Sequence, residues 1–65
     1  MIQDVMLYEI YQNTEKLLKE ALRELKQIGI EKRTLITMDE RILLVCLEEK
    51  ILGAIGSTQR LKGMA

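Results

Sequence analysis

The chain has no histidine, no proline, no tryptophan, no phenylalanine and a single cysteine among its 65 residues. The absence of histidine removes the commonest general base and the commonest metal ligand. One cysteine excludes a disulfide framework within the chain. The longest uninterrupted apolar run extends only from Ile42 to Leu47, whereas a membrane-spanning helix needs roughly 18 apolar residues. Composition therefore argues against a metal site, a disulfide-stabilised scaffold and a transmembrane segment.

Charge is balanced, because ten Lys and Arg residues offset ten Asp and Glu residues. A neutral chain has no global basic field to attract nucleic acid or an anionic membrane surface, so we expect neither as a partner. No convergent set of polar residues accompanies the missing histidine, so we expect no enzyme, no catalytic residues and no cofactor. The first four residues lack the basic and apolar regions of a signal peptide, which favours a cytoplasmic location.

Hydrophobic residues make up 48% of the chain, which is enough apolar surface to exclude a disordered protein. A chain of this length buries only about 60% of the surface that its unfolded form exposes, so it is marginally stable alone. Small domains without disulfides or metals often gain the missing stability by oligomerising. We therefore expect residues 1–65 to form one domain that works with a partner.

The first part of the chain, residues 3–28, predicts one amphipathic helix with an apolar arc of about 140°. Glu15 and Lys19 are spaced as a favourable ion pair on a helix, and Thr14 is expected to donate a hydrogen bond to a carbonyl of the preceding turn. Gly29 is a typical residue at which a helix stops. The apolar positions are Leu7, Ile10, Tyr11, Leu17, Leu18, Ala21, Leu22, Leu25 and Ile28.

The second part changes its hydrophobic period. Three short apolar runs are separated by the acidic pairs at 39–40 and 48–49. This pattern indicates an antiparallel meander after the helix, and hence an α+β fold. Neither acidic pair contains the Gly or Asn of a favoured hairpin turn. The expected strands are residues 33–38, 41–47 and 50–56, followed by a tail at 57–65.

A second helix is the alternative for the same residues. Thr37 and Glu40 have the spacing of a capping box, and Leu, Glu and Lys are good helix formers. On a helical wheel, however, the apolar residues of 39–55 point in nearly every direction, so a second helix would expose several large side chains. For that reason we favour the meander.

In the meander, the strand 41–47 carries apolar side chains on both faces. One helix covers only one face of a three-stranded sheet, so a second copy or another protein is expected to cover the other. Cys46 is interpreted as a small buried hydrophobic residue. Two tyrosines, three positions apart on the first helix, are expected to touch the partner or close the core. The candidate interface residues are Ile42, Leu44, Cys46, Tyr8 and Tyr11.

This order of helix and apolar runs resembles the second half of the roadblock family, over about half the chain. The resemblance implies a dimerising scaffold that associates with small GTPases and has no catalytic residues. The chain lacks the family's first helix and two-strand hairpin, so one copy cannot form the usual five-stranded sheet. The matching segments are Leu25 to Ile30, Leu35 to Glu40, Ile42 to Val45 and Ile51 to Ile55.

We therefore expect a non-catalytic interaction or scaffold module that self-associates through its sheet, roadblock-like and associated with a GTPase. The alternative is a small all-helical regulatory protein, in which two antiparallel helices present an amphipathic face to a partner.

Overall fold

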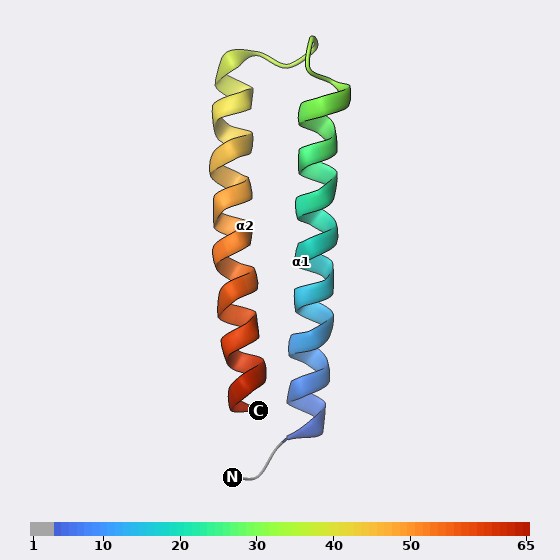
Figure 1. Ribbon diagram of the computed structural model, residues 1–65, viewed down its shortest axis with the longest axis vertical. Helices are drawn as coiled ribbons and strands as arrows, with labels where there is room; N and C mark the ends of the chain where they lie inside the picture. The colour runs from blue at the N-terminus through green and yellow to red at the C-terminus, as the bar shows by residue number, and fades with distance from the viewer. Residues whose placement is uncertain (1–3) are drawn as a thin grey trace.

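In a computed structural model of the chain, which describes residues 4–65, two long helices run antiparallel and are joined by a short turn (Figure 1). Helix α1 spans Val5–Glu31 and helix α2 spans Met38–Met64, with 27 residues each. The two helices lie side by side along their whole length, and the hairpin measures 51 × 16 × 10 Å. The fold is therefore an all-helical hairpin.

The predicted α+β fold is wrong, because residues 4–65 contain no strand. The expected strands 41–47 and 50–56 and most of the tail 57–65 lie within α2, and the expected strand 33–38 lies in the turn and the first residue of α2. The three-stranded half-sheet that the roadblock resemblance implies is wrong for the same reason. The all-helical alternative describes this part of the chain correctly.

Helix α2 begins where the capping box predicts. The backbone N–H of Glu40 donates to Thr37 Oγ1 over 3.1 Å, and the backbone N–H of Thr37 donates to Glu40 Oε1 over 3.4 Å. These two bonds satisfy backbone donors that a helix N-terminus leaves without partners. Asp39 and Glu40 in the first turn also interact favourably with the helix dipole. The acidic pair that looks like a strand break therefore starts a helix.

Helix α1 begins after Asp4, whose carboxylate accepts a hydrogen bond from the backbone N–H of Leu7 over 3.1 Å. The predicted start at Gln3 lies outside the described residues. The predicted stop at Gly29 is wrong, because the helix continues to Glu31 and no described glycine has a positive φ. In the turn that follows, Arg41 Nη2 donates to the carbonyl of Arg33 over 3.2 Å.

One row of side chains from each helix packs against the other helix. Every member of both rows is buried or half-buried, yet Leu22 and Ile55 are the only large apolar residues among 4–65 that are buried, and each keeps nearly a tenth of its surface exposed. Two helices alone thus enclose a thin core. The facing row of α1 is Tyr11, Glu15, Leu18, Leu22, Leu25 and Gly29, and that of α2 is Arg41, Leu44, Glu48, Ile51, Ile55, Thr58 and Lys62.

Candidate protein-interaction face

Helix α1 carries a second apolar row beside the one that faces α2. The spacings between its large members are three residues or sums of three and four residues, so they lie on one side of the helix. All four are exposed, and Leu17 has 65% of its surface in solvent. A helix with two adjacent apolar rows is typical of a bundle with more than two helices. The large members of this row are Ile10, Leu17 and Ile28, with Leu7 at the edge that this row shares with the row facing α2.

Helix α2 carries a matching row of exposed leucines at Leu43, Leu47 and Leu61, with the half-buried Ala54 between them. In each helix the exposed row lies about a quarter turn around the helix axis from the row that packs inside the hairpin. This quarter turn has the same sense in both helices when each is viewed from its N-terminus. Because the helices are antiparallel, these two quarter turns lead to the same side of the hairpin. Both exposed rows therefore belong to one surface.

Near the turn the two rows meet directly. Ile28 from α1 and Leu43 and Leu47 from α2 line one groove of about 340 Å³, together with Ile36 from the turn. We call the surface formed by both exposed rows the apolar face. It consists of Leu7, Ile10, Leu17 and Ile28 of α1 and Leu43, Leu47 and Leu61 of α2.

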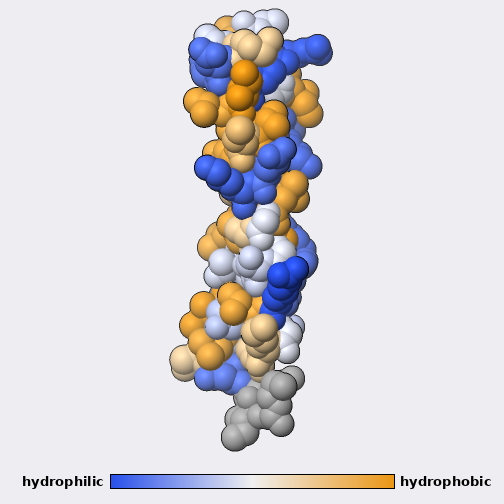
Figure 2. Space-filling model, turned by 90° about the vertical axis from the view of Figure 1, so that its left-hand side faces the viewer, coloured by the Kyte–Doolittle hydropathy of each residue, from blue (hydrophilic) through white to orange (hydrophobic). Residues whose placement is uncertain are grey.

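The outer side of α2 carries further apolar side chains. Ile42, Val45 and Leu52 are each about half exposed and lie on the flank of α2 opposite the apolar face. Figure 2 looks onto α2 from outside and shows hydrophobic patches at several heights along the left edge, but mainly in the upper half of the right edge. Apolar surface is thus not confined to the side of α2 that contacts α1.

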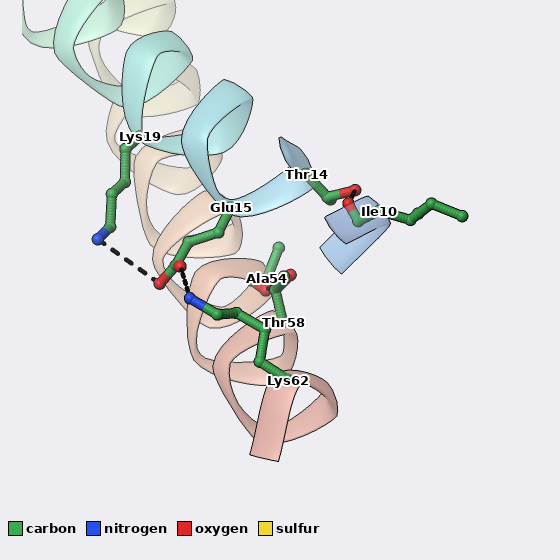
Figure 3. A network of polar contacts seen from close by, with 7 residues as sticks. All are labelled: Ile10, Thr14, Glu15, Lys19, Ala54, Thr58 and Lys62. Atoms are coloured by element: carbon green, nitrogen blue, oxygen red, sulfur yellow. Dashed lines mark hydrogen bonds and ion pairs between the residues drawn. The ribbon is translucent and has the colours of Figure 1, made fainter. Parts of the chain in front are cut away.

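A polar contact joins the helices near their open end (Figure 3). Lys62 Nζ lies 2.8 Å from Glu15 Oε1, and Lys19 Nζ lies 3.5 Å from Glu15 Oε2. The predicted pair of Glu15 and Lys19 is therefore confirmed. Lys62 Nζ also lies 5.6 Å from the centre of the Tyr8 ring, within range of a cation–π interaction. The contact fixes the register of α2 against α1 at this end.

The charge of Glu15 depends on this contact. The hydrogen bond from Lys62 is the main reason that the pKa of Glu15 is lowered from 4.5 to about 2, and the same bond raises the pKa of Lys62. Glu15 is 7% exposed, and a carboxylate so enclosed needs a cationic partner. Both groups are thus charged and paired at neutral pH.

Two hydroxyl groups beside this contact are already satisfied. Thr14 Oγ1 donates to the carbonyl of Ile10, and Thr58 Oγ1 donates to the carbonyl of Ala54, each over 2.8 Å. The hydrogen bond predicted for Thr14 is confirmed. Neither hydroxyl is left as a reactive group, so the cluster has the character of a structural contact.

The candidate interface residues do not form one surface. Successive alternate residues are about 200° apart on a helix, so Leu44 packs in the row facing α1 while Ile42 lies on the outer flank of α2. Cys46 is exposed, and its predicted burial is wrong. Tyr8 is exposed beside Lys62, and Tyr11 is half-buried in the facing row of α1.

Sequence reasoning missed the contribution of α2 to the apolar face. The signal is the spacing of Leu43, Leu47, Ala54 and Leu61, which keeps to one side only if the segment is a helix. Read as strands, these residues are divided among the strand 41–47, the strand 50–56 and the tail 57–65, so they form no common row. Four of the α1 positions were already in the predicted apolar stripe, which runs through Leu7, Ile10, Leu17 and Ile28.

Comparison with known proteins found no matching family model, no matching curated protein and no matching solved structure. Within residues 4–65, no three potential metal ligands come together. Over the same part of the chain, neither helix combines the length and the apolar character that a bilayer crossing requires.

Proposed function

We propose that this protein is a small, non-catalytic helical module that presents its apolar face to the helices of a partner protein. The observation that carries the proposal is that the hairpin exposes far more large apolar side chains than it buries. Among residues 4–65, two large apolar side chains are buried and seventeen are exposed. Seven of the exposed ones belong to the apolar face.

The energetic argument follows from that imbalance. Burying a large aliphatic side chain that is otherwise exposed is worth roughly 1.5–3 kcal/mol. A folded domain has only about 5–15 kcal/mol of stability in total. Contiguous exposed apolar surface marks interaction sites in soluble proteins, and a helical surface with apolar residues at three- and four-residue spacing matches the geometry of helix-to-helix recognition.

A non-catalytic role agrees with the polar groups of the hairpin. A concavity of about 660 Å³ runs along the polar side of α1 and is lined by side chains of both charges. Its buried carboxylate, Glu15, is already paired with Lys62. Catalysis requires a nucleophile or base oriented toward substrate, whereas here the enclosed polar group holds the two helices together.

Site-specific photo-crosslinking in native cells tests the proposal. A photo-crosslinking amino acid replaces Leu17 on the apolar face in one version of the protein, and replaces Gln12 on the polar side of α1 in the other. Both positions are exposed on the same helix. We expect a discrete crosslinked adduct from position 17 and none from position 12. Adducts of equal yield from both positions, or from position 12 alone, would contradict the proposal.

A further inference from the structure

Each row of the apolar face is interrupted by one charged side chain. In α1 the row that runs through Leu17 and Ala21 to Ile28 passes through Glu24 at the intervening helical position. In α2 the row that runs from Leu47 to Ala54 passes through Lys50. Thr14 and Ser57 occupy the other gaps between the apolar members, and Glu40 precedes Leu43 at the turn end of α2, where it lines the groove. The two interruptions have opposite charges.

The two charges lie at the same height on the hairpin. In the groove near the turn, Ile28 lies beside Leu43 and Leu47. Glu24 lies about one helical turn from Ile28 toward the open end, and Lys50 lies about one turn from Leu47 in the same direction. Glu24 and Lys50 therefore lie at about the same height on the apolar face, one in each row.

Neither charge is used within one copy. Glu24 and Lys50 are both exposed, and the ion pairs among residues 4–65 involve only Glu15, Lys19 and Lys62. A covered apolar face would remove both charges from water, which is unfavourable unless each acquires a partner of opposite charge. The occupant of the face must therefore offer a cation opposite Glu24 and an anion opposite Lys50.

The same face of a second copy meets this requirement. We propose that two copies of the chain pack apolar face to apolar face as a four-helix bundle, with both turns at the same end and Glu24 of each copy against the partner's Lys50. A two-fold axis parallel to the helices places α1 of one copy over α2 of the other and keeps every residue at its own height. This inference rests on the proposed function and names the partner.

The opposite orientation does not satisfy the charges. A two-fold axis perpendicular to the helices places α1 over α1 and α2 over α2. The exposed row of α1 contains no Lys or Arg that could face Glu24. The carboxylate in the row of α2, Glu40, lines the groove at the turn end of the helix, well away from Lys50. Glu24 would then be covered without a cationic partner. A single buried polar pair is a known device for selecting one orientation in helical bundles.

Charge exchange tests the pairing. The single variants Glu24→Lys and Lys50→Glu each place like charges against one another, and sedimentation equilibrium should show the dissociation constant of the dimer rising at least about tenfold. The double variant carrying both changes restores opposite charges and should return within about threefold of the wild type. If a weakened dimer also loses its helices, circular dichroism should show the same rescue.

A matched control uses the same change of charge elsewhere on α1. Glu9 is exposed on the polar side of the helix, where it lines the polar concavity, so Glu9→Lys should leave the dissociation constant unchanged. A wild-type protein that remains monomeric at millimolar concentration would overturn the inference. So would a double variant that dissociates as readily as the single variants.

Distance measurement tests the orientation. Spin labels are attached at Arg33→Cys in a Cys46→Ser background, one label in the turn of each copy. With both turns at the same end, pulsed electron paramagnetic resonance should give a separation well below half the length of the hairpin. Turns at opposite ends would lie nearly the full 51 Å apart, and that result would overturn the proposed arrangement.

The two proposals fail differently. A monomer that still forms an adduct with another protein through position 17 would contradict the four-helix dimer and leave the interaction module standing. A dimer whose adducts form through position 12 would contradict the apolar face as the interaction surface.

Discussion

Glu15 and Lys62 form the one ion pair that joins α1 to α2 among residues 4–65. Folding lowers the pKa of Glu15 to about 2 from its ordinary value of 4.5. The contact therefore stabilises the folded protein above pH 4.5, and this contribution is lost as the pH falls toward 2. The raised pKa of Lys62 has the complementary effect, because its contribution is present below 10.5 and is lost at higher pH.

We predict that Glu15→Gln lowers the thermal midpoint of unfolding at pH 7 and removes part of the acid sensitivity. The glutamine keeps the size of the side chain but loses the charge that Lys62 pairs with. Thermal unfolding followed by circular dichroism between pH 2 and pH 7 measures both effects. Glu9→Gln is the control and should retain the acid sensitivity of the wild type. If the thermal midpoint of Glu15→Gln depended on pH in the same way as that of the wild type, the role of Glu15 in acid sensitivity would be contradicted.

Local contacts of single residues can be predicted from the sequence, whereas distant ones cannot. The bond from Thr14 to Ile10 and the pair of Glu15 with Lys19 each span four positions, so helical geometry alone determines them. Lys62 is 47 positions from Glu15. Its role depends on the register of two antiparallel helices, which no local pattern in either helix specifies.

At the scale of the element, α2 contains three glycines within a continuous helix, at Gly53, Gly56 and Gly63. A side-chain carbon added at any of them would meet no atom within 4 Å. Glycine in a helix interior costs about 0.5–1 kcal/mol relative to alanine, because the unfolded glycine has more conformational freedom. Replacing these glycines with alanine is therefore expected to increase the free energy of unfolding.

We predict that Gly56→Ala stabilises the protein by about 0.5–1 kcal/mol, as measured by urea unfolding. Gly56 lies on the flank of α2 away from the apolar face, so the change leaves the proposed interface intact. Gly63→Ala, in the last turn, serves for comparison and should have a smaller effect, because helix ends fray. A loss of stability in Gly56→Ala would show that a second surface packs against this flank.

The first helix follows from its apolar period, but the second does not. The capping box at Thr37 and Glu40 correctly predicts where α2 starts, and the missing turn residues at 39–40 and 48–49 argue against strands. The argument for strands came from the exposed side chains that a second helix leaves, and the hairpin does expose them. That argument assumed that one copy must bury its own apolar residues. The assumption does not hold for a helix whose apolar residues are buried by another molecule.

At the scale of the whole molecule, the thin core and the exposed apolar face predict that stability depends on association. For a folded dimer that unfolds to separate chains, each tenfold increase in protein concentration adds about 1.4 kcal/mol to the free energy of unfolding. We predict a thermal midpoint that rises with concentration, measured by circular dichroism over a hundredfold range. A midpoint independent of concentration would contradict association through the apolar face.

We predict that Leu17→Ala distinguishes the lone hairpin from the bundle. Leu17 is 65% exposed within one copy, so its loss should change a lone hairpin by less than about 0.5 kcal/mol. In the bundle the same side chain is covered, and its removal should cost about 2 kcal/mol or more. Lys16→Ala, its neighbour on the polar side, should leave the midpoint and its concentration dependence unchanged.

The outer flank of α2 has a consequence for how pairs of hairpins behave in crowded solution. Ile42, Val45 and Leu52 are each about half exposed in one copy, and the proposed dimer leaves them uncovered. The chain also has no net charge with which to repel its neighbours. Near neutral pH, such dimers would have an exposed apolar surface on each outer side and little electrostatic repulsion between them. Association of these dimers through the outer sides of α2 would build larger assemblies by adding one dimer at a time. This association would limit the solubility of the protein.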